Sequence, residues 1–333
     1  MNAAQQVRVD SEEDGMRLDR WFKLHYPQLT HAYLNKLLRT GQVRLDGGRV
    51  KANARLKGGQ EIRVPPFSYD TRPADAPRSE KSASAGDRAL LNSLIIYSDD
   101  DLMILNKPSG LAVQGGPKTP HHIDGILEGM ALEFGERPRL VHRLDRDTSG
   151  VLVIARRRSI ASSLGRLFAT RSVRKIYWAL VHGVPKPEQG KVAAALVKTA
   201  GPEGDRVRAA RPGEQEQAQH ATTHYAVIDR AAQKLAWVSL KPVTGRQHQL
   251  RAHMAMIGHP IIGDNKYEAD RPFPAEGMEN RLHLHARRIS FPHPRGGTVD
   301  VSAPLPGHMT RSFEMFGFDA SRYAQAGDSG DET

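Results

Sequence analysis

The sequence predicts an α+β protein with a small N-terminal module and a larger domain that contains a mixed, mainly antiparallel sheet. Short apolar runs of strand length follow one another after residue 90, with few helical patterns between them. Residues 67–89 are rich in Pro, Ser, Ala, Asp and Arg, as in a linker. The length of 333 residues exceeds one typical core. We therefore expect an extension at residues 1–15, the module at 16–66, the linker at 67–89, the larger domain at 90–310, and a tail at 311–333 whose end is disordered.

The module is predicted to begin with two helices. Thr30 is a candidate N-cap for the second, apolar residues then recur at helical spacing, and Gly41 ends the helix. Lys36 and Arg39 fall on its polar face. Residues 42–46 and 49–51 alternate as two strands of a hairpin that carries Arg44 and Arg49, and residues 61–64 form a closing strand.

Positive charge is concentrated in this module. The chain has 48 Lys and Arg against 37 Asp and Glu, which gives +11 and a pI near 9.9. Residues 16–65 contain 11 Lys and Arg and 3 Asp and Glu, so 11 minus 3 places +8 there. A merely solvated face would have both signs interspersed. The excess favours a polyanionic partner bound through Lys36, Arg39, Arg44 and Arg49.

The larger domain has few predicted helices. Two stand out by apolar spacing, one around residues 160–168 and one around 250–257. The candidate strands are residues 94–97, 102–105, 151–155, 176–181, 223–228 and 235–240.

Cysteine is absent, which excludes disulfides, thiolate metal sites and a cysteine nucleophile. His283 and His285 share a strand face, but no third metal ligand is evident. The polar start of the chain does not resemble a secretory leader, and no apolar stretch has the length of a membrane span. We expect a cytosolic protein that needs no metal or organic cofactor.

The densest group of functional side chains lies at residues 139–155, RLVHRLDRDTSGVLVIA. Asp145 precedes an apolar strand that would hold it rigidly, and Arg143 and Arg146 can keep its carboxylate ionised. From composition alone, a turn or capping acid is the favoured interpretation of Asp145.

This segment resembles the catalytic motif of the RluA-type pseudouridine synthases, closest to the branch that acts on large-subunit (23S) ribosomal RNA. Further stretches match in order at residues 105–111, 175–177, 242–253 and 258–264, so the resemblance covers roughly residues 94–306. Residues 16–66 resemble the S4-like RNA-binding domain, named after a small-subunit ribosomal protein, that commonly precedes this catalytic domain. The resemblance implies an isomerase that acts on ribosomal RNA or on a pre-ribosomal particle. We expect a monomer without membrane association.

Position by position, the resemblance implies that Asp145 is the essential aspartate, that Tyr177 packs against the target base, and that Arg251 pairs with Asp145. The carboxylate can serve as a nucleophile at C1′ or as a base that removes a sugar proton, and both routes stay open. The resemblance also implies that Arg143 enters the space left by a flipped uridine. Lys107 and Leu250 are further expected RNA contacts.

Two other functions use similar residues. A glycoside or nucleoside hydrolase also has a carboxylate at an anomeric carbon, but it needs a second carboxylate, and Asp147 would point to the opposite side of an extended chain. A non-enzymatic ribosome-assembly protein would depend on the basic module alone, and would not require Asp145, Tyr177 and Arg251 together.

Overall fold

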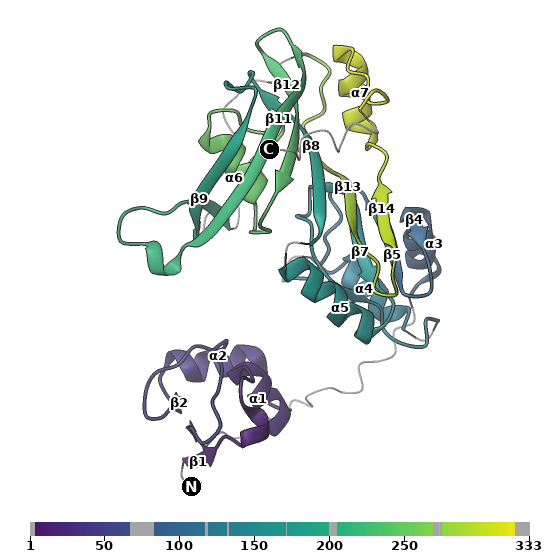
Figure 1. Cartoon of the computed structure of the whole chain (residues 1–333). Coiled ribbons are helices and arrows are strands. Elements are labelled where there is room, and N and C mark those ends of the chain that lie inside the picture. Colours follow the sequence, from purple (N-terminus) through teal and green to yellow (C-terminus); the bar gives the residue numbers. More distant parts are fainter. Residues whose placement is uncertain are drawn as a thin grey trace. The chain divides into compact units, whose positions relative to one another are not determined.

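The computed structural model describes residues 4–66, 83–116, 119–131, 133–170, 172–199, 205–268, 273 and 275–323. The chain divides into two compact units, Met1–Glu80 and Lys81–Thr333 (Figure 1). Within the described ranges, every helix is too short or too polar to span a bilayer.

The N-terminal unit combines two helices with a three-stranded sheet in the order β1-β3-β2. Its core includes Trp21 and Phe22 of the first helix, Leu37 of the second and Ile62 of β3. The Thr30 hydroxyl accepts a hydrogen bond from the Tyr33 amide at 3.2 Å, so the predicted N-cap is confirmed. The elements are β1 (Gln5–Arg8), the 3-10 helix η1 (Ser11–Glu13), α1 (Leu18–His25), α2 (His31–Arg39), β2 (Arg44–Leu45) and β3 (Glu61–Val64).

Two parts of this unit differ from the sequence prediction. Residues 4–15 are not an extension, because β1 pairs with β3 and Val9 is buried. Residues 49–51 do not form a strand. The Asp46 carboxylate accepts hydrogen bonds from the Glu61 amide and the Gln60 side chain, both at 2.8 Å. These bonds attach the turn to β3, so the hairpin ends after a single bridge from Leu45 to Gly48.

The C-terminal unit is built on one mixed sheet in the order β10-β9-β11-β12-β8-β13-β7-β5-β4, with β14 beside β13 and β6 beside β7. All pairs are antiparallel except β13 with β7, which confirms a mixed, mainly antiparallel sheet. The strands are β4 (Ile95–Ser98), β5 (Leu102–Lys107), β6 (Arg139–Leu140), β7 (Ser149–Ala155), β8 (Arg174–His182), β9 (Gln189–Thr199), β10 (Arg206–Ala209), β11 (Gln219–Ala231), β12 (Leu235–Pro242), β13 (Leu284–Pro292) and β14 (Thr298–Ser302). The helices are α3 (Ala85–Leu94), α4 (Ile123–Gly129), α5 (Arg158–Ala169), η2 (Gln215–Gln217), α6 (Gln249–Met256) and α7 (Gly307–Phe316).

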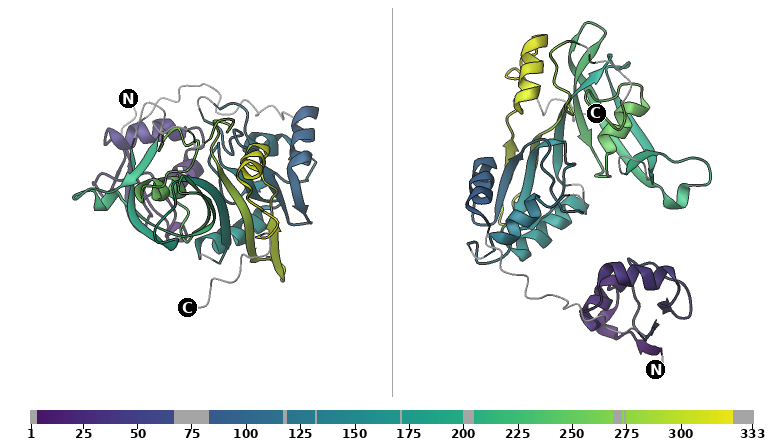
Figure 2. Two further views of the ribbon diagram at one scale, coloured as in Figure 1. Left: turned by 90° about the horizontal axis from the view of Figure 1, so that it is seen from above. Right: turned by 180° about the vertical axis from the view of Figure 1, so that it is seen from behind.

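Helices α6 and α7 cover opposite faces of the sheet. Tyr177 is paired with Leu240, and Leu240 with Tyr225, so these side chains share a face. Leu250 of α6 packs into the same cluster as Leu240 and Tyr225. We call this the front face. The half-sheet β12-β11-β9 curls around α6 when seen from above (Figure 2).

The other face, the back face, carries Trp178 and Trp237, against which Met309 and Phe313 of α7 pack. Helix α7 therefore belongs to the larger domain, although its residues fall largely within the predicted tail. Helix α3 likewise lies partly in the predicted linker, where a Ser84 capping box starts it. The remaining linker residues 67–82 and the chain end 324–333 lie outside the described residues.

Candidate active site

Asp145 lies in the loop of residues 141–148 that joins β6 to β7. Contacts of His142 with neighbouring residues hold this loop in place. The His142 ring stacks on Phe168, with centroids 4.8 Å apart, and its Nε2 accepts a hydrogen bond from the Val153 amide at 2.9 Å. Burial lowers the pKa of His142 to about 3, so the imidazole is neutral and can accept.

The loop enters β7 through Gly150, which has φ +108°. A Cβ at this position would collide with the Ala286 carbonyl of β13. Only glycine allows the parallel pairing of β7 with β13 to begin directly after the Asp145 loop.

Lys107 lies beneath the same loop with 0% exposure. Its ammonium donates to the carbonyls of Pro108, Leu111 and Arg146, each at 2.8 Å. Burial lowers its pKa to about 7, while the carboxylates of Asp147 and Asp145 oppose the shift. The expected contact of Lys107 with RNA is wrong, because the side chain is buried. The side chain instead ties residues 108–111 to the Asp145 loop.

The Asp145 carboxylate faces two nitrogen groups. Arg251 Nη1 lies 3.8 Å from Asp145 Oδ2, and His248 Nε2 lies 4.0 Å from the same oxygen. The expected pairing of Arg251 with Asp145 is therefore present, although the structure gives Arg251 a closer partner as well.

That partner is Asp264, which is fully buried. Arg251 donates from Nε and Nη2 to its two oxygens at 2.7 and 2.6 Å, and the guanidinium lies over the Tyr267 ring at 5.4 Å. Burial opposes the charge of Arg251, but the hydrogen bonds and charge of Asp264 outweigh it, and the net pKa is raised. Arg251 thus stays protonated and is oriented with Nη1 toward Asp145.

Tyr177 extends from β8 into the cavity beside Asp145. Burial raises the pKa of Tyr177 well above its usual value, and the negative charge of Asp145 adds to the effect. The phenol is therefore a neutral hydroxyl on an aromatic face at physiological pH.

The loop before α6 forms another wall of the cavity. Both ends of the Gln249 side-chain amide are hydrogen-bonded. Its Oε1 accepts from the Thr244 hydroxyl and the Arg246 backbone amide. Its Nε2 donates to the Thr222 carbonyl and the Thr223 hydroxyl. His248 adopts a left-handed conformation with φ 50°, a strained choice for a non-glycine residue. The turn directs the His248 ring toward Asp145.

Together these residues line a cavity of about 90 Å³. Its walls combine an acid, several cations, an aromatic ring and apolar side chains, and include Arg143, Leu144, Asp145, Lys175, Tyr177, Arg246, His248, Leu250 and Arg251. Arg143 is exposed and Leu250 is buried. The structure thus brings five expected site residues together around this cavity. Asp147 is not among its lining residues.

Three features of the site were not predicted from the sequence: Asp264, His248 and Gln249. All three fall within stretches quoted for the resemblance, yet nothing in the spacing paired Asp264 with Arg251. A buried acid thirteen residues beyond a buried arginine gives no local pattern, because the contact depends on the turn after α6.

The four remaining expected residues lie in the N-terminal unit. Lys36 and Arg39 are exposed on α2, and Arg49 is exposed nearby. Arg44 is half-buried and donates to the carbonyls of Gly41 and Gly47, both at 3.1 Å. We call these four residues the basic surface.

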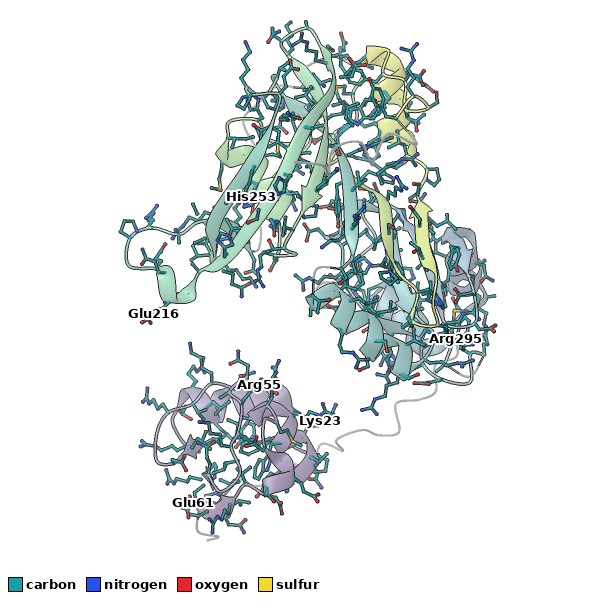
Figure 3. The ribbon with its side chains drawn as sticks, viewed as in Figure 1. Lys23, Arg55, Glu61, Glu216, His253 and Arg295 are labelled. Atoms are coloured by element: carbon teal, nitrogen blue, oxygen red, sulfur yellow. The ribbon has the colours of Figure 1, made fainter. Side chains whose placement is uncertain are left out.

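His253 of α6, labelled in Figure 3, is fully buried with Nδ1 at 2.9 Å from the Thr223 hydroxyl. In the described ranges, no three His, Asp or Glu side chains come close enough to hold a metal ion.

Known proteins resemble this chain along most of its length. The family model described as RNA pseudouridylate synthase matches residues 101–256. Ribosomal large subunit pseudouridine synthase C of Escherichia coli (strain K12) is 35% identical, over 92% of this chain and 95% of the relative. The protein of that name from Vibrio cholerae serotype O1 is 36% identical over the same shares.

A solved structure, human RNA Pseudouridylate Synthase Domain Containing 4, superposes with a TM-score of 0.58 at 30% identity, covering 69% of this chain and 97% of its own. The sequence relatives are matched over more than nine-tenths of both chains. The chain therefore belongs to the RNA pseudouridylate synthase family.

Proposed function

We propose that the protein isomerises specific uridines of large-subunit ribosomal RNA to pseudouridine. Its relatives from Escherichia coli and Vibrio cholerae are named for this activity. The observation that carries the proposal is the cavity in which Asp145 meets both Tyr177 and an arginine oriented by Asp264.

The reaction exchanges one bond for another. The C1′–N1 bond of uridine breaks, the uracil turns within the pocket, and a C1′–C5 bond forms. C5 loses a proton and N1 gains one, so no atom enters or leaves. Asp145 acts as the nucleophile at C1′ or as the base at the sugar, and the surroundings of its carboxylate are compatible with both routes.

Arg251 and Tyr177 support different steps of this exchange. Arg251 stabilises the Asp145 carboxylate in a largely dry site, where an isolated charge would be costly. Tyr177 offers its ring for stacking against the uracil and its hydroxyl for proton transfer at C5. Leu250 supplies apolar contact to the base.

Arg143 is our candidate for the residue that replaces the flipped uridine in the RNA stack. It is exposed, lies two residues from Asp145 and lines the same cavity. Arg143→Ala should slow modification of a uridine in a folded stem more than of an unpaired one, because only the stem must be opened. Equal slowing on both substrates would make Arg143 an electrostatic support for Asp145 instead.

The N-terminal unit acts as an S4-like RNA-binding domain in this proposal. Its basic surface contacts phosphates, which gives affinity without base readout. We further propose that the protein acts in the cytosol as a monomer, with no membrane association, on ribosomal RNA or a pre-ribosomal particle.

One assay separates the proposal from its rivals. Purified protein is incubated with a large-subunit ribosomal RNA transcript, and pseudouridine and free uracil are quantified, with Asp145→Ala as the control. The proposal expects pseudouridine from the wild type only. Free uracil would indicate a hydrolase. RNA binding without either product would indicate an assembly protein.

A further inference from the structure

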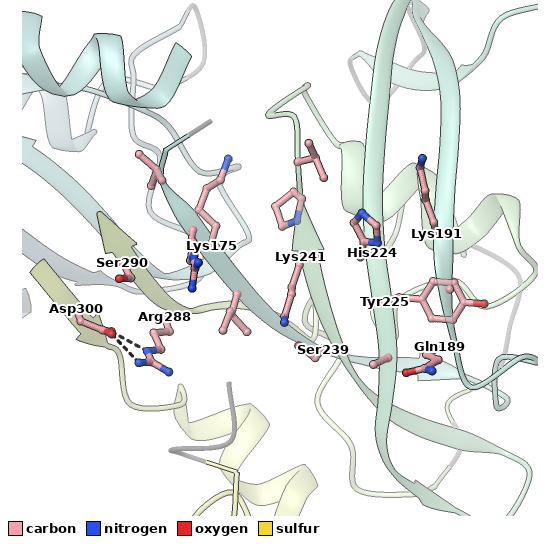
Figure 4. A pocket seen from close by; sticks show the side chains of 17 residues that line it. Lys175, Gln189, Lys191, His224, Tyr225, Ser239, Lys241, Arg288, Ser290 and Asp300 are labelled. Atoms are coloured by element: carbon pink, nitrogen blue, oxygen red, sulfur yellow. Dashed lines mark hydrogen bonds and ion pairs between the residues drawn. The ribbon is translucent and has the colours of Figure 1, made fainter. Parts of the chain in front are cut away.

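A second cavity, of about 730 Å³, lies in the C-terminal unit near the ends of the strands that carry the active site (Figure 4). We call it the back groove. It lies on the face opposite Tyr177: Trp178 is paired with Ser239 and Ser239 with Ala226, and both of these partners line the groove. Helix α7 covers Trp178 on this face but contributes no residue to the groove.

Three basic side chains form a row across the floor of the back groove. His224 of β11 is the register partner of both Lys241 in β12 and Lys191 in β9. Adjacent strands lie about 4.8 Å apart, so these side chains emerge side by side. His224 therefore lies between the two lysine side chains. Figure 4 shows the three residues projecting from neighbouring strands.

The groove contains little negative charge to balance this row of basic side chains. Its lining has five Lys and Arg side chains and a single carboxylate, that of Asp300. Asp300 is already bound by Arg288 through two hydrogen bonds of 2.7 and 2.6 Å. Lys191, His224 and Lys241 have no ion pair with any residue that the structure describes. Lys191 and His224 are exposed, and Lys241 is half-buried.

The back groove meets the active site at one end of the sheet. Lys175 at the start of β8 and Pro242 at the end of β12 line both cavities. A polyanion that leaves the active site around this edge would pass directly into the groove.

We propose that the back groove binds the phosphate backbone of the RNA substrate next to the segment held in the active site. This inference rests on the proposed function. The occupant is a nucleic-acid strand rather than a small anion, because the row of basic side chains spans three strands and continues toward a cavity expected to hold a nucleotide. Contacts of this kind contribute affinity and salt dependence but little sequence preference.

The test uses the full-length chain with Lys191→Gln and Lys241→Gln combined, which removes two charges from the row. The matched control is Lys186→Gln with Lys234→Gln, which removes two exposed lysines from the β8–β9 and β11–β12 loops, neither of which lines the groove. Thermal unfolding of both variants checks that each is folded. Affinity for a full-length large-subunit ribosomal RNA transcript is measured over a range of salt concentrations.

The groove variant should bind the transcript more weakly at low salt. The slope of log K against log salt should decrease by about one per lysine removed, and the control should keep the wild-type slope. Unchanged RNA binding in a folded groove variant would overturn the proposal, and would also be the outcome if the groove served an acidic protein segment. A wild type that binds RNA in this way but forms no pseudouridine would overturn the proposed function and leave the groove intact.

Discussion

The cavity around Asp145 and the basic surface of the N-terminal unit both depend on charged side chains, but their surroundings differ. In the cavity, Arg251 is buried and its orientation is fixed by two hydrogen bonds to Asp264. On the basic surface, Lys36 and Arg39 are exposed at one end of α2. Buried, oriented charges suit chemistry, because they need no rearrangement as a reaction proceeds. Exposed charges suit affinity for phosphates, because they adapt to the path of the RNA.

The largest effect is expected at Asp145. Asp145→Asn keeps the shape of the side chain and removes its charge. Turnover should therefore fall by about 100- to 10,000-fold or more. RNA affinity should change little, because we propose that the N-terminal unit binds the phosphates. Single-turnover kinetics and a binding titration on the same preparation measure both. A variant with wild-type turnover would remove Asp145 from the chemistry.

Tyr177→Phe should have the next largest effect. The ring stays available for stacking, while the hydroxyl that we propose for proton transfer is lost. We therefore expect substrate binding to persist and most turnover to disappear. Tyr177→Leu serves as the comparison, because it should weaken binding as well. If the Phe variant retained full turnover, the hydroxyl would have no part in proton transfer.

Lys107→Met tests the residue whose predicted RNA contact the structure contradicts. The substitution removes three hydrogen bonds from a charged donor to the carbonyls of Pro108, Leu111 and Arg146, each worth about 1.5–3 kcal/mol. Urea unfolding should show a large loss of stability, whereas the salt dependence of RNA binding should match the wild type. A stable variant with weaker, less salt-dependent binding would restore Lys107 as an RNA contact.

Substitutions on the basic surface should have the smallest effect on turnover. Lys36→Gln with Arg39→Gln should weaken RNA binding and lower its salt slope by about two, while the rate at saturating RNA stays unchanged. Lys23→Gln with Arg55→Gln, two other cations of the same unit that Figure 3 labels, is the charge-matched comparison. Equal effects from both pairs would mean that binding depends on net charge and not on this surface.

The sequence predicted the class of the fold, and several elements follow directly from their residues. The strand at Glu61–Val64 alternates between exposed and buried side chains, and the helix at Arg158–Ala169 has apolar residues at helical spacing. Two of the elements that the sequence did not predict illustrate the physical reasons. Strand β9 contains three consecutive alanines, which have low strand propensity. Helix α7 is only partly apolar, and its packing against Trp178 and Trp237 stabilises it.

The site was predicted in part. Asp145, Tyr177 and Arg251 were expected to converge, and the structure places all three around one cavity. Lys107 was misplaced because a sequence shows that a residue is charged but not whether it is buried. The Arg251 contact with Asp264 depends on how residues 257–264 turn back after α6, which no local pattern encodes.

We propose that Asp264 sets the rate of isomerisation through Arg251 and does not set RNA affinity. The most direct measurement is the single-turnover rate and the RNA dissociation constant of Asp264→Asn, beside those of Lys36→Gln with Arg39→Gln. Loss of one partner of a buried ion pair costs about 3–5 kcal/mol, so thermal unfolding first fixes a temperature at which the variant is folded. We expect Asp264→Asn to lower the rate and preserve affinity, and the Lys36 and Arg39 variant to do the reverse. A folded Asp264→Asn protein with an unchanged rate would contradict this proposal.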